Sequence, residues 1–250
     1  TGARAARGGA RAGRGGGVSA RSLFVTGTDT GVGKTVVACT VLRQLVADGQ
    51  RAVGFKPVAS GCETTPHGLR NDDALALQAA SGLSAAYEQI NPYAFAPPIA
   101  PHLAAASVGQ TVRISVLDQA HAALAACADW VIVEGAGGWA VPLNDDLSFG
   151  GWVAQRDWPV LLVVGMRLGC INHAMLSVEA ISRRARLVGW VANGLAERMD
   201  AYDETLACLK RQIAVPFWGE IATGRPHGAQ LDLSRLAQLR CETTDDAGPP

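Results

Sequence analysis

The residues best suited to chemistry lie in one glycine-rich stretch, Thr26-Gly-Thr-Asp-Thr-Gly-Val-Gly-Lys-Thr35. Its glycines, at positions 27, 31 and 33, let the backbone fold tightly enough for successive N–H groups to face one anion. Lys34 adds a positive charge there, and the hydroxyl of Thr35 is a ligand for magnesium. An apolar run precedes the stretch and a helical pattern follows it. The sequence therefore predicts a phosphate cradle where a buried strand turns into a helix, whose N-terminal dipole also favours phosphate.

This stretch departs from the strict phosphate-loop spacing G-x-x-x-x-G-K-[ST], because position 28 is Thr and the outer glycine, Gly27, comes one residue early. A chance Gly-Lys-Thr without function is the alternative. The flanking strand and helix are the context that a functional motif requires, so we interpret the stretch as a variant P-loop that binds phosphate.

Lysine is scarce in this chain, which has Lys34, Lys56 and Lys210 among 22 basic residues. Lys34 and Lys56 both follow apolar runs, and ligands of open α/β sheets bind outside the carboxyl ends of the strands. A composition that otherwise prefers arginine indicates that a compact point charge is needed at these two positions, beside phosphate oxygens. The simpler alternative for Lys56 is a surface side chain.

A third apolar run is followed directly by the block Glu134-Gly-Ala-Gly-Gly138, which begins with a carboxylate residue. Beside a P-loop such a carboxylate can hold magnesium, and the glycines let backbone amides approach a ligand. A purely structural Glu134 would need a paired charge. Asp73 is a candidate second carboxylate, although an Asp near a helix start is more often a cap.

Short buried runs alternate with longer helical stretches along the chain, which is typical of βαβ units around a parallel sheet. We expect a three-layer α/β fold in one domain, with helices on both faces of the sheet. The predicted strands cover residues 23–26, 52–55, 130–133, 160–164 and 187–191, with a weaker one at 216–218. The predicted helices cover residues 34–47, 72–80, 115–126, 171–184 and 201–212. The proline-rich segment 91–102 is expected to be a long loop near the site or a dimer surface.

The two ends of the 250-residue chain differ from its body. Residues 1–21 are rich in Gly, Ala and Arg and predict a disordered extension, and residues 241–250 predict a frayed tail. Residues 22–240 then form the predicted catalytic domain.

Five of the 22 basic residues precede the first acidic residue, Asp29, so the rest of the chain is net negative. That distribution argues against a nucleic-acid-binding body.

Two further patterns bear on the cellular environment. The apolar runs are too short to span a membrane, so we expect no membrane partner. The six cysteines show neither a C-x-x-C pair nor metal-ligand spacing, which favours reduced thiols in the cytoplasm.

Three more blocks, Gly54-Phe-Lys-Pro-Val-Ala-Ser-Gly61, Leu168-Gly-Cys-Ile-Asn-His173 and Gly189-Trp-Val-Ala-Asn193, complete a set with the P-loop and the Glu134 block. Over residues 23–221 this set resembles the dethiobiotin synthetase family, whose members are ATP-dependent carboxylases that close the ureido ring in biotin synthesis. The resemblance implies ATP, Mg²⁺, 7,8-diaminononanoate and CO₂ or bicarbonate as ligands. One amine becomes a carbamate that attacks the γ-phosphate, and the other amine displaces phosphate from the mixed anhydride. Positioning and charge neutralisation should dominate such a reaction.

The resemblance also implies roles for individual residues. The catalytic residues would be Lys34, Lys56 and Ser60, with Ser60 beside the carbamate. ATP would contact Gly27, Thr28, Asp29, Thr30, Gly31, Val32, Gly33, Lys34, Thr35, Asp73, Glu134 and Asn193. Of these, Thr35, Asp73 and Glu134 would also hold the metal, and Asn193 would read adenine. The substrate would contact Ser60, Gly135, Gly137, Gly138, Leu168, Gly169, Cys170, Ile171 and Asn172. Residues 169–172 would receive the substrate carboxylate from the neighbouring subunit of a homodimer with composite sites.

Three positions depart from the family pattern. Position 31 is Gly where some relatives carry an acidic residue, and Arg167 replaces a lysine that often precedes Leu-Gly. The segment Gly219-Glu-Ile-Ala222 lacks a proline, which leaves adenine contacts beyond Asn193 open.

A second interpretation is a partitioning or placement ATPase of the same P-loop superfamily, which acts as a nucleotide-gated dimer switch. Such proteins usually carry a signature lysine five residues before the loop lysine, and here that position is Asp29. They also commonly present a basic or amphipathic surface to DNA or membrane, which the acidic body lacks.

Overall fold

A computed structural model describes residues 20–195, 197–223 and 229–238. At its centre six strands form one sheet: β1 (Arg21–Gly27), β2 (Ala52–Phe55), β7 (Trp130–Gly138), β8 (Val160–Met166), β9 (Leu187–Gly194) and β10 (Phe217–Ile221). Their order is β10-β9-β8-β1-β7-β2, and every neighbouring pair is parallel. β1, β8 and the first part of β7 are buried on both faces, as their continuous apolar runs predict.

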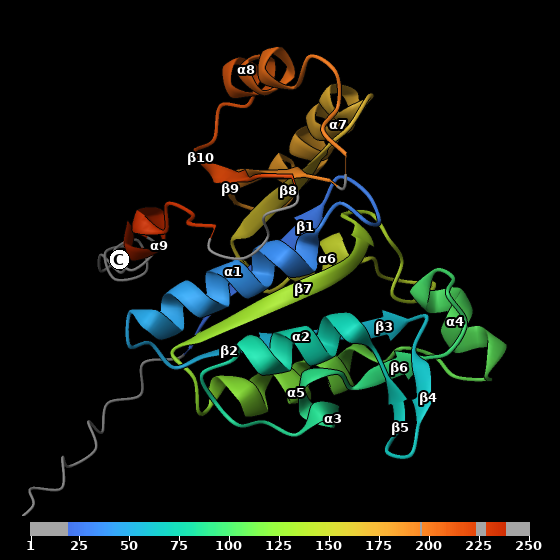
Figure 1. The fold of residues 1–250 in the computed structure, drawn as a ribbon. Helices are drawn as coiled ribbons and strands as arrows, with labels where there is room; N and C mark the ends of the chain where they lie inside the picture. The colour runs from blue at the N-terminus through green and yellow to red at the C-terminus, as the bar shows by residue number, and fades with distance from the viewer. Residues whose placement is uncertain (1–19, 196, 224–228, 239–250) are drawn as a thin grey trace, which may run out of the picture.

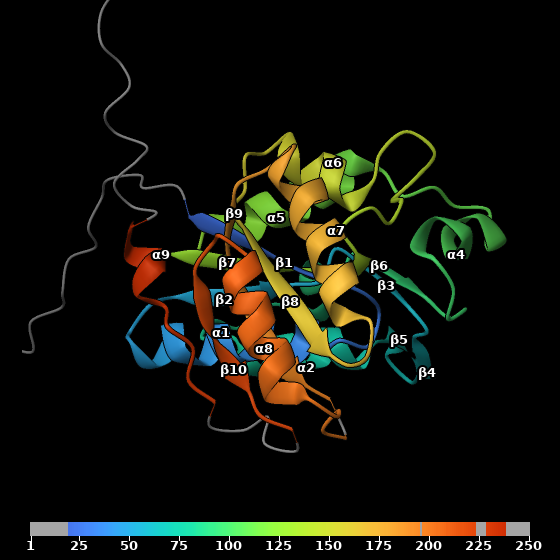
Figure 2. The ribbon, with the colours of Figure 1, turned by 90° about the horizontal axis from the view of Figure 1, so that it is seen from above.

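Helices cover both faces of this sheet (Figures 1 and 2). One face packs against α1 (Lys34–Ala47), α2 (Asp72–Ala80) and α9 (Ser234–Gln238). The other packs against α5 (Ile114–Ala125), α6 (Phe149–Ala154), α7 (Cys170–Ser182) and α8 (Tyr202–Gln212). Successive side chains of β1 point to opposite faces of the sheet and so belong to two different parts of the core. Leu23 and Val25 face α1, whereas Phe24 lies against Phe149 of α6.

The order in which the chain adds strands to the sheet changes direction at β1. From β1 it passes through α1 to the edge strand β2, returns to β7, and then continues on the other side of β1 with β8. The carboxyl ends of β1, β7 and β2 consequently lie side by side, because these strands are parallel neighbours. Ligands of open α/β sheets bind at such an edge.

A long excursion separates β2 from β7 and carries α2 and α5 with several short elements. These are β3 (Val58–Ser60), β4 (Glu63–Thr65), β5 (Gly68–Arg70), α3 (Tyr87–Ile90), β6 (Tyr93–Phe95) and α4 (Pro101–Ser107). β3 pairs with β6 in parallel, and β4 and β5 form an antiparallel hairpin. α4 and this hairpin project from the body beyond the carboxyl end of β2 (Figure 1).

The α/β class and the layered parallel sheet predicted from the sequence are confirmed, as are all six predicted strands. The five predicted helices also exist, and α1 and α2 have the predicted bounds. The prediction of one long loop at residues 91–102 was wrong. Residues 93–95 form β6, and α4 begins at Pro101, because a proline at the first helical position removes only an N–H that has no partner within the helix.

The predicted extension and tail fall mostly outside the described residues, which begin at residue 20 and end at residue 238. Arg21, placed at the end of the extension, is instead the first residue of β1. Its backbone N–H donates to the carbonyl of Asp129, and its guanidinium lies 4.0 Å from the centre of the Trp130 ring. The first strand therefore starts at residue 21, two residues before the predicted start at residue 23.

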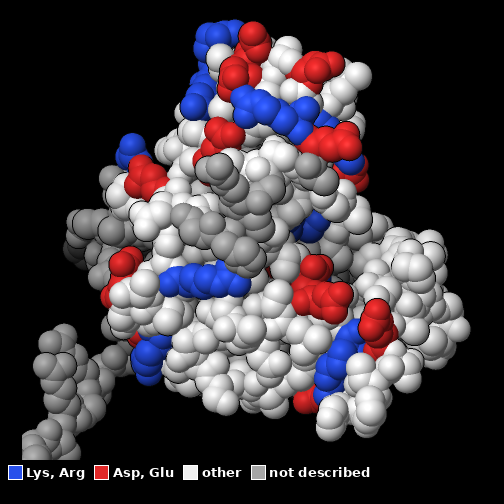
Figure 3. All heavy atoms as spheres, in the orientation of Figure 1, with Lys and Arg blue, Asp and Glu red and all other residues white. Residues whose placement is uncertain are grey.

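The surface in Figure 3 intersperses acidic and basic side chains, and it is nearly uncharged over the lobe that contains α4. In the sequence no Asp, Glu, Lys or Arg occurs between Glu88 and Arg113. No helix among the described residues is both long and apolar enough to cross a membrane.

Candidate active site

The P-loop connects the carboxyl end of β1 to α1, and its geometry depends on Gly33. This residue is the N-cap of α1 and has a φ of 87°. A Cβ added there would lie 2.1 Å from Nδ2 of Asn193, which donates a 2.9 Å hydrogen bond to the carbonyl of Val32. Asn193, at the end of β9, is thus packed directly under the loop, and only glycine fits above it.

We expect Gly33→Ala to lower nucleotide affinity by at least about tenfold. The alanine would adopt a left-handed conformation, at a cost of roughly 1–2 kcal/mol, and would also push Asn193 off the Val32 carbonyl. Gly49→Ala is the matched control, since Gly49 has a φ of 75° and nothing within 4 Å of an added Cβ. Nucleotide titrations of both variants check the prediction, and equal affinities in the two would contradict it.

Lys34, the first residue of α1, is buried, with 6% of its surface exposed. Its Nζ donates to the carbonyl of Asp29 at 3.0 Å, so the side chain folds back over its own loop. Burial, together with the nearby charge of Lys56, lowers the pKa of Lys34 to about 8. The ammonium has few partners to give up when an anion enters the loop.

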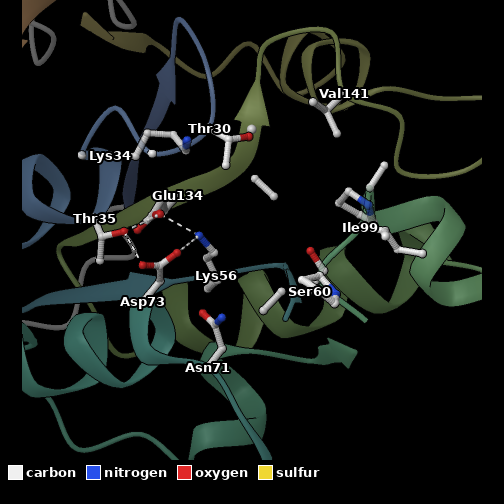
Figure 4. A pocket seen from close by; sticks show the side chains of 18 of the residues that line it. Thr30, Lys34, Thr35, Lys56, Ser60, Asn71, Asp73, Ile99, Glu134 and Val141 are labelled. Atoms are coloured by element: carbon white, nitrogen blue, oxygen red, sulfur yellow. Dashed lines mark hydrogen bonds and ion pairs between the residues drawn. The ribbon is translucent and has the colours of Figure 1, made fainter. Parts of the chain in front are cut away.

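Four polar side chains meet beside Lys34 (Figure 4). Oγ1 of Thr35 lies 2.7 Å from Oδ1 of Asp73 and 2.9 Å from Oε1 of Glu134. Nζ of Lys56 donates to Oδ2 of Asp73 at 2.8 Å and to the same Oε1 of Glu134 at 2.6 Å. We call this group the lysine–carboxylate cluster. It unites residues from α1, α2, β7 and the end of β2.

Burial and pairing act together on the ionisation of this cluster. Burial alone would lower the pKa of Lys56, but the charges of Glu134 and Asp73 outweigh it and raise that pKa. Burial raises the pKa of Glu134, which is fully buried, despite the favourable charge of Lys56. For Asp73, burial is outweighed by Lys56, so its pKa is lowered. Lys56 therefore stays charged as the counter-ion of two carboxylates.

The donor set of the cluster fits magnesium. Mg²⁺ is commonly held by one or two carboxylates together with substrate phosphates and water. Thr35, Asp73 and Glu134 supply a hydroxyl and two carboxylates, and Oε2 of Glu134 is a buried oxygen with no hydrogen-bond partner among the described residues. Within the described part of the chain no group of three or more His, Cys, Asp or Glu residues could hold a metal ion.

A cavity of about 670 Å³ adjoins the cluster. The predicted site residues that line it are Thr30, Gly31, Gly33, Lys34, Thr35, Lys56, Ser60, Asp73, Glu134 and Gly137. Ser60, at the end of β3, lies across the cavity from the cluster, beside Ile99 (Figure 4). The structure thus brings the P-loop, both candidate lysines and both candidate carboxylates around one space.

The sequence of this chain matches that of one family over most of its length. The family model described as an AAA domain matches residues 21–229. The ATP-dependent dethiobiotin synthetase BioD of Pseudescherichia vulneris is 50% identical over 220 residues, which cover 85% of this chain and 92% of that protein. BioD 1 of Escherichia coli strain K12 is 51% identical over 199 residues, or 79% of this chain and 88% of that one. This chain belongs to the dethiobiotin synthetase family.

A more distant likeness supports the fold alone. The signal recognition particle receptor FtsY of Elizabethkingia anophelis has a TM-score of 0.53 and 18% identity, over 86% of this chain and 63% of that one. This chain thus shares its fold with a protein of quite different sequence.

In this dethiobiotin synthetase chain the predicted substrate segment 168–172 does not line the cavity. Gly169 is the N-cap of α7, and Leu168 is 94% exposed at a different hollow of the surface. Cys170 is buried, and its backbone N–H already donates to the carbonyl of Arg167. Asn172 is exposed. The remaining predicted residues outside the cavity lining are Gly27, Thr28, Asp29, Val32, Gly135, Gly138 and Asn193.

One wall of the cavity in this family member was not predicted from the sequence. Pro98, Ile99, Ala100 and Pro101 line it from the turn into α4, and Val141 lines it from the loop after β7. These side chains are apolar and belong to no recognisable sequence motif. The position of segment 91–102 beside the site was the only part of this wall that the sequence indicated.

Proposed function

We propose that this chain is an ATP-dependent dethiobiotin synthetase, a ligase that carboxylates 7,8-diaminononanoate and closes the ureido ring in biotin biosynthesis. The observation that carries the proposal is the 50% identity, over 92% of its length, to a protein of that name. The chemistry of the cavity agrees with it, since a phosphate loop, two lysines and two carboxylates meet there.

In this proposal the P-loop amides and Lys34 hold the triphosphate of ATP. A helix N-terminus with its glycine loop binds phosphate through backbone N–H groups and the helix dipole. Lys56 stabilises the charge of the carbamate and of the transferring phosphoryl group. Its buried side chain lines the cavity, as does that of Lys34, and fixed charges of this kind act strongly where water is excluded.

Thr35, Asp73 and Glu134 would hold Mg²⁺. When bound, the ion would neutralise phosphate charge. Ser60 and the apolar wall at Ile99 lie across the cavity from the cluster. They suit the carbamate end and the aliphatic chain of the diamine, respectively. The atoms that react would thus lie between the two walls.

We also propose a homodimer with composite sites. Segment 168–172 contributes nothing to the cavity of its own chain, yet it opens a helix that can receive a carboxylate. Large apolar side chains are exposed on both candidate surfaces: Leu168 just before α7 and Leu176 in the middle of it, and Ile99 and Leu103 near α4. A two-fold interface would cover such patches and bring segment 168–172 to the partner's cavity.

A cytoplasmic location completes the proposal. It is supported by the cysteines at positions 39, 62, 127, 170 and 208, which are all free thiols, as is typical of a reducing compartment.

The deciding experiment measures ADP and dethiobiotin with purified protein, ATP and Mg²⁺. Strict dependence of ATP turnover on diaminononanoate and bicarbonate, and loss of the product when Mg²⁺ is chelated, are expected. ATP turnover without dethiobiotin, or turnover stimulated by DNA or lipid, would refute the proposal and favour a nucleotide-gated switch.

A further inference from the structure

Beneath the lysine–carboxylate cluster lies a buried polar pair, Tyr87 and Asn91. Tyr87 is 6% exposed and Asn91 3% exposed. The hydroxyl of Tyr87 donates to Oδ1 of Asn91 at 3.0 Å, and the backbone N–H of Asn91 donates to the carbonyl of Tyr87 at 2.7 Å. A buried hydroxyl and a buried amide cost free energy unless all their groups are bonded, so the partners of this pair indicate what it holds.

One side of the pair holds the backbone of Lys56. Nδ2 of Asn91 donates to the carbonyl of Lys56 at 2.7 Å and to the carbonyl of Tyr93 at 3.0 Å. The N–H of Lys56 donates to the carbonyl of Ile90 at 2.8 Å. Both peptide groups of Lys56 are thus bonded to the segment that begins with α3. This segment acts on Lys56 like a short neighbouring strand.

The other side of the pair holds the start of α2. The N–H of Asn71 donates to the hydroxyl of Tyr87 at 2.8 Å, while Oδ1 of Asn71 accepts from the N–H of Ala74 and caps the helix. Asp73 is the second residue of this capped helix. The position of its carboxylate therefore follows from where Tyr87 holds Asn71.

We propose that Tyr87 and Asn91 are positioning residues, which set the distance between Lys56 and Asp73 by tying their two backbones together. The inference rests on the roles given to Lys56 and Asp73 in the proposed function. Neither Tyr87 nor Asn91 is among the described residues that line the cavity. They act through the 2.8 Å contact between Nζ of Lys56 and Oδ2 of Asp73.

The test is Tyr87→Phe, which removes the hydroxyl and leaves the ring. Tyr93→Phe is a matched control, because the hydroxyl of Tyr93 also accepts a backbone N–H, from Arg113 at 3.1 Å, on the nearby strand β6. We expect Tyr87→Phe to lower kcat about tenfold, since a displacement of about 1 Å can cost up to about 10²-fold. The KM for ATP should change less than kcat does, because the P-loop amides and Lys34 still hold the triphosphate. Tyr93→Phe should retain wild-type kcat.

A second readout follows Lys56 directly. The chain has only three lysines, so selective ¹⁵N-lysine labelling gives three backbone amide resonances, for Lys34, Lys56 and Lys210. The Lys56 resonance is assigned by its absence from Lys56→Arg. In Tyr87→Phe it should shift, whereas that of Lys210 on α8 should not. Asn91→Ser removes the amide that bonds the carbonyl of Lys56, together with its bonds to the carbonyl of Tyr93 and the hydroxyl of Tyr87. This variant should shift the Lys56 resonance too, and it replaces Tyr87→Phe if that variant does not fold.

The outcomes separate the two claims. An unmoved Lys56 resonance in both variants, with an active wild-type protein, would overturn the positioning role alone. Equal losses of kcat in Tyr87→Phe and Tyr93→Phe would overturn it as well, because the effect would then be general to this part of the fold. Absence of dethiobiotin from the wild-type reaction would instead overturn the proposed function.

Discussion

Lys56→Met should lower turnover by about 10²- to 10³-fold while ATP still binds. That range is typical for removing one group that stabilises charge developing in a transition state. Binding should survive because the P-loop amides and Lys34 remain in place. The fold should survive too. Burial already raises the pKa of Glu134, so its carboxyl can take up a proton when its counter-ion is lost.

The measurement pairs single-turnover kinetics with a nucleotide titration. Lys210→Met is the matched control, because Lys210 is the one remaining lysine and is exposed on α8. The turnover of Lys210→Met should equal that of the wild type. Wild-type-like turnover in Lys56→Met, or loss of nucleotide binding in parallel with turnover, would show that Lys56 has been given the wrong role.

Mixing two inactive variants should restore activity if the sites are composite. One variant is Lys56→Met and the other is Asn172→Trp, which blocks the start of α7. In a mixed dimer one site would carry both lesions and the other would be intact. Random exchange makes about half of the dimers mixed, and half of their sites work, so activity should recover to about a quarter of the wild-type value under two-fold symmetry.

The control for that experiment is the exchange itself. Differently labelled wild-type subunits, mixed under the same conditions, must be shown to form dimers of both labels. Zero recovery despite proven exchange would mean that Lys56 and Asn172 serve the same site within one chain. Activity of Asn172→Trp by itself would instead show that the start of α7 has no part in the reaction.

Much of the fold could be predicted from the sequence, because its strongest signals are local. The continuous apolar run at residues 160–164 and the glycine loop before α1 each specify an element and its burial within about ten residues. The lysine–carboxylate cluster was predictable only in parts. Lys56 and Glu134 each follow a predicted strand, and Asp73 lies in the first turn of a predicted helix. Their 2.6–2.8 Å contacts, however, depend on how β2 and β7 pair.

The roles of Asn193 and Asn91 were not predictable in this way. The family resemblance implied that Asn193 recognises adenine. Its side-chain amide also donates to the carbonyl of Val32 in the P-loop, 161 positions earlier in the sequence. Asn91 stands in a proline-rich, uncharged segment that predicts a loop. Its importance appears only when the chain folds back and places it against Lys56, 35 positions earlier in the sequence.

The pairing of charges around the cavity has a consequence for how ATP arrives. Lys34 and Lys56 balance Asp73 and Glu134, and Arg167 pairs with Asp29 at the rim of the loop. A site whose positive and negative charges balance produces no strong electrostatic field in the solvent. It therefore cannot attract a highly charged anion from a distance. Capture of the nucleotide must then rely on collision followed by short-range contact with the loop amides. The association rate should accordingly depend little on ionic strength, even though several formal charges line the cavity.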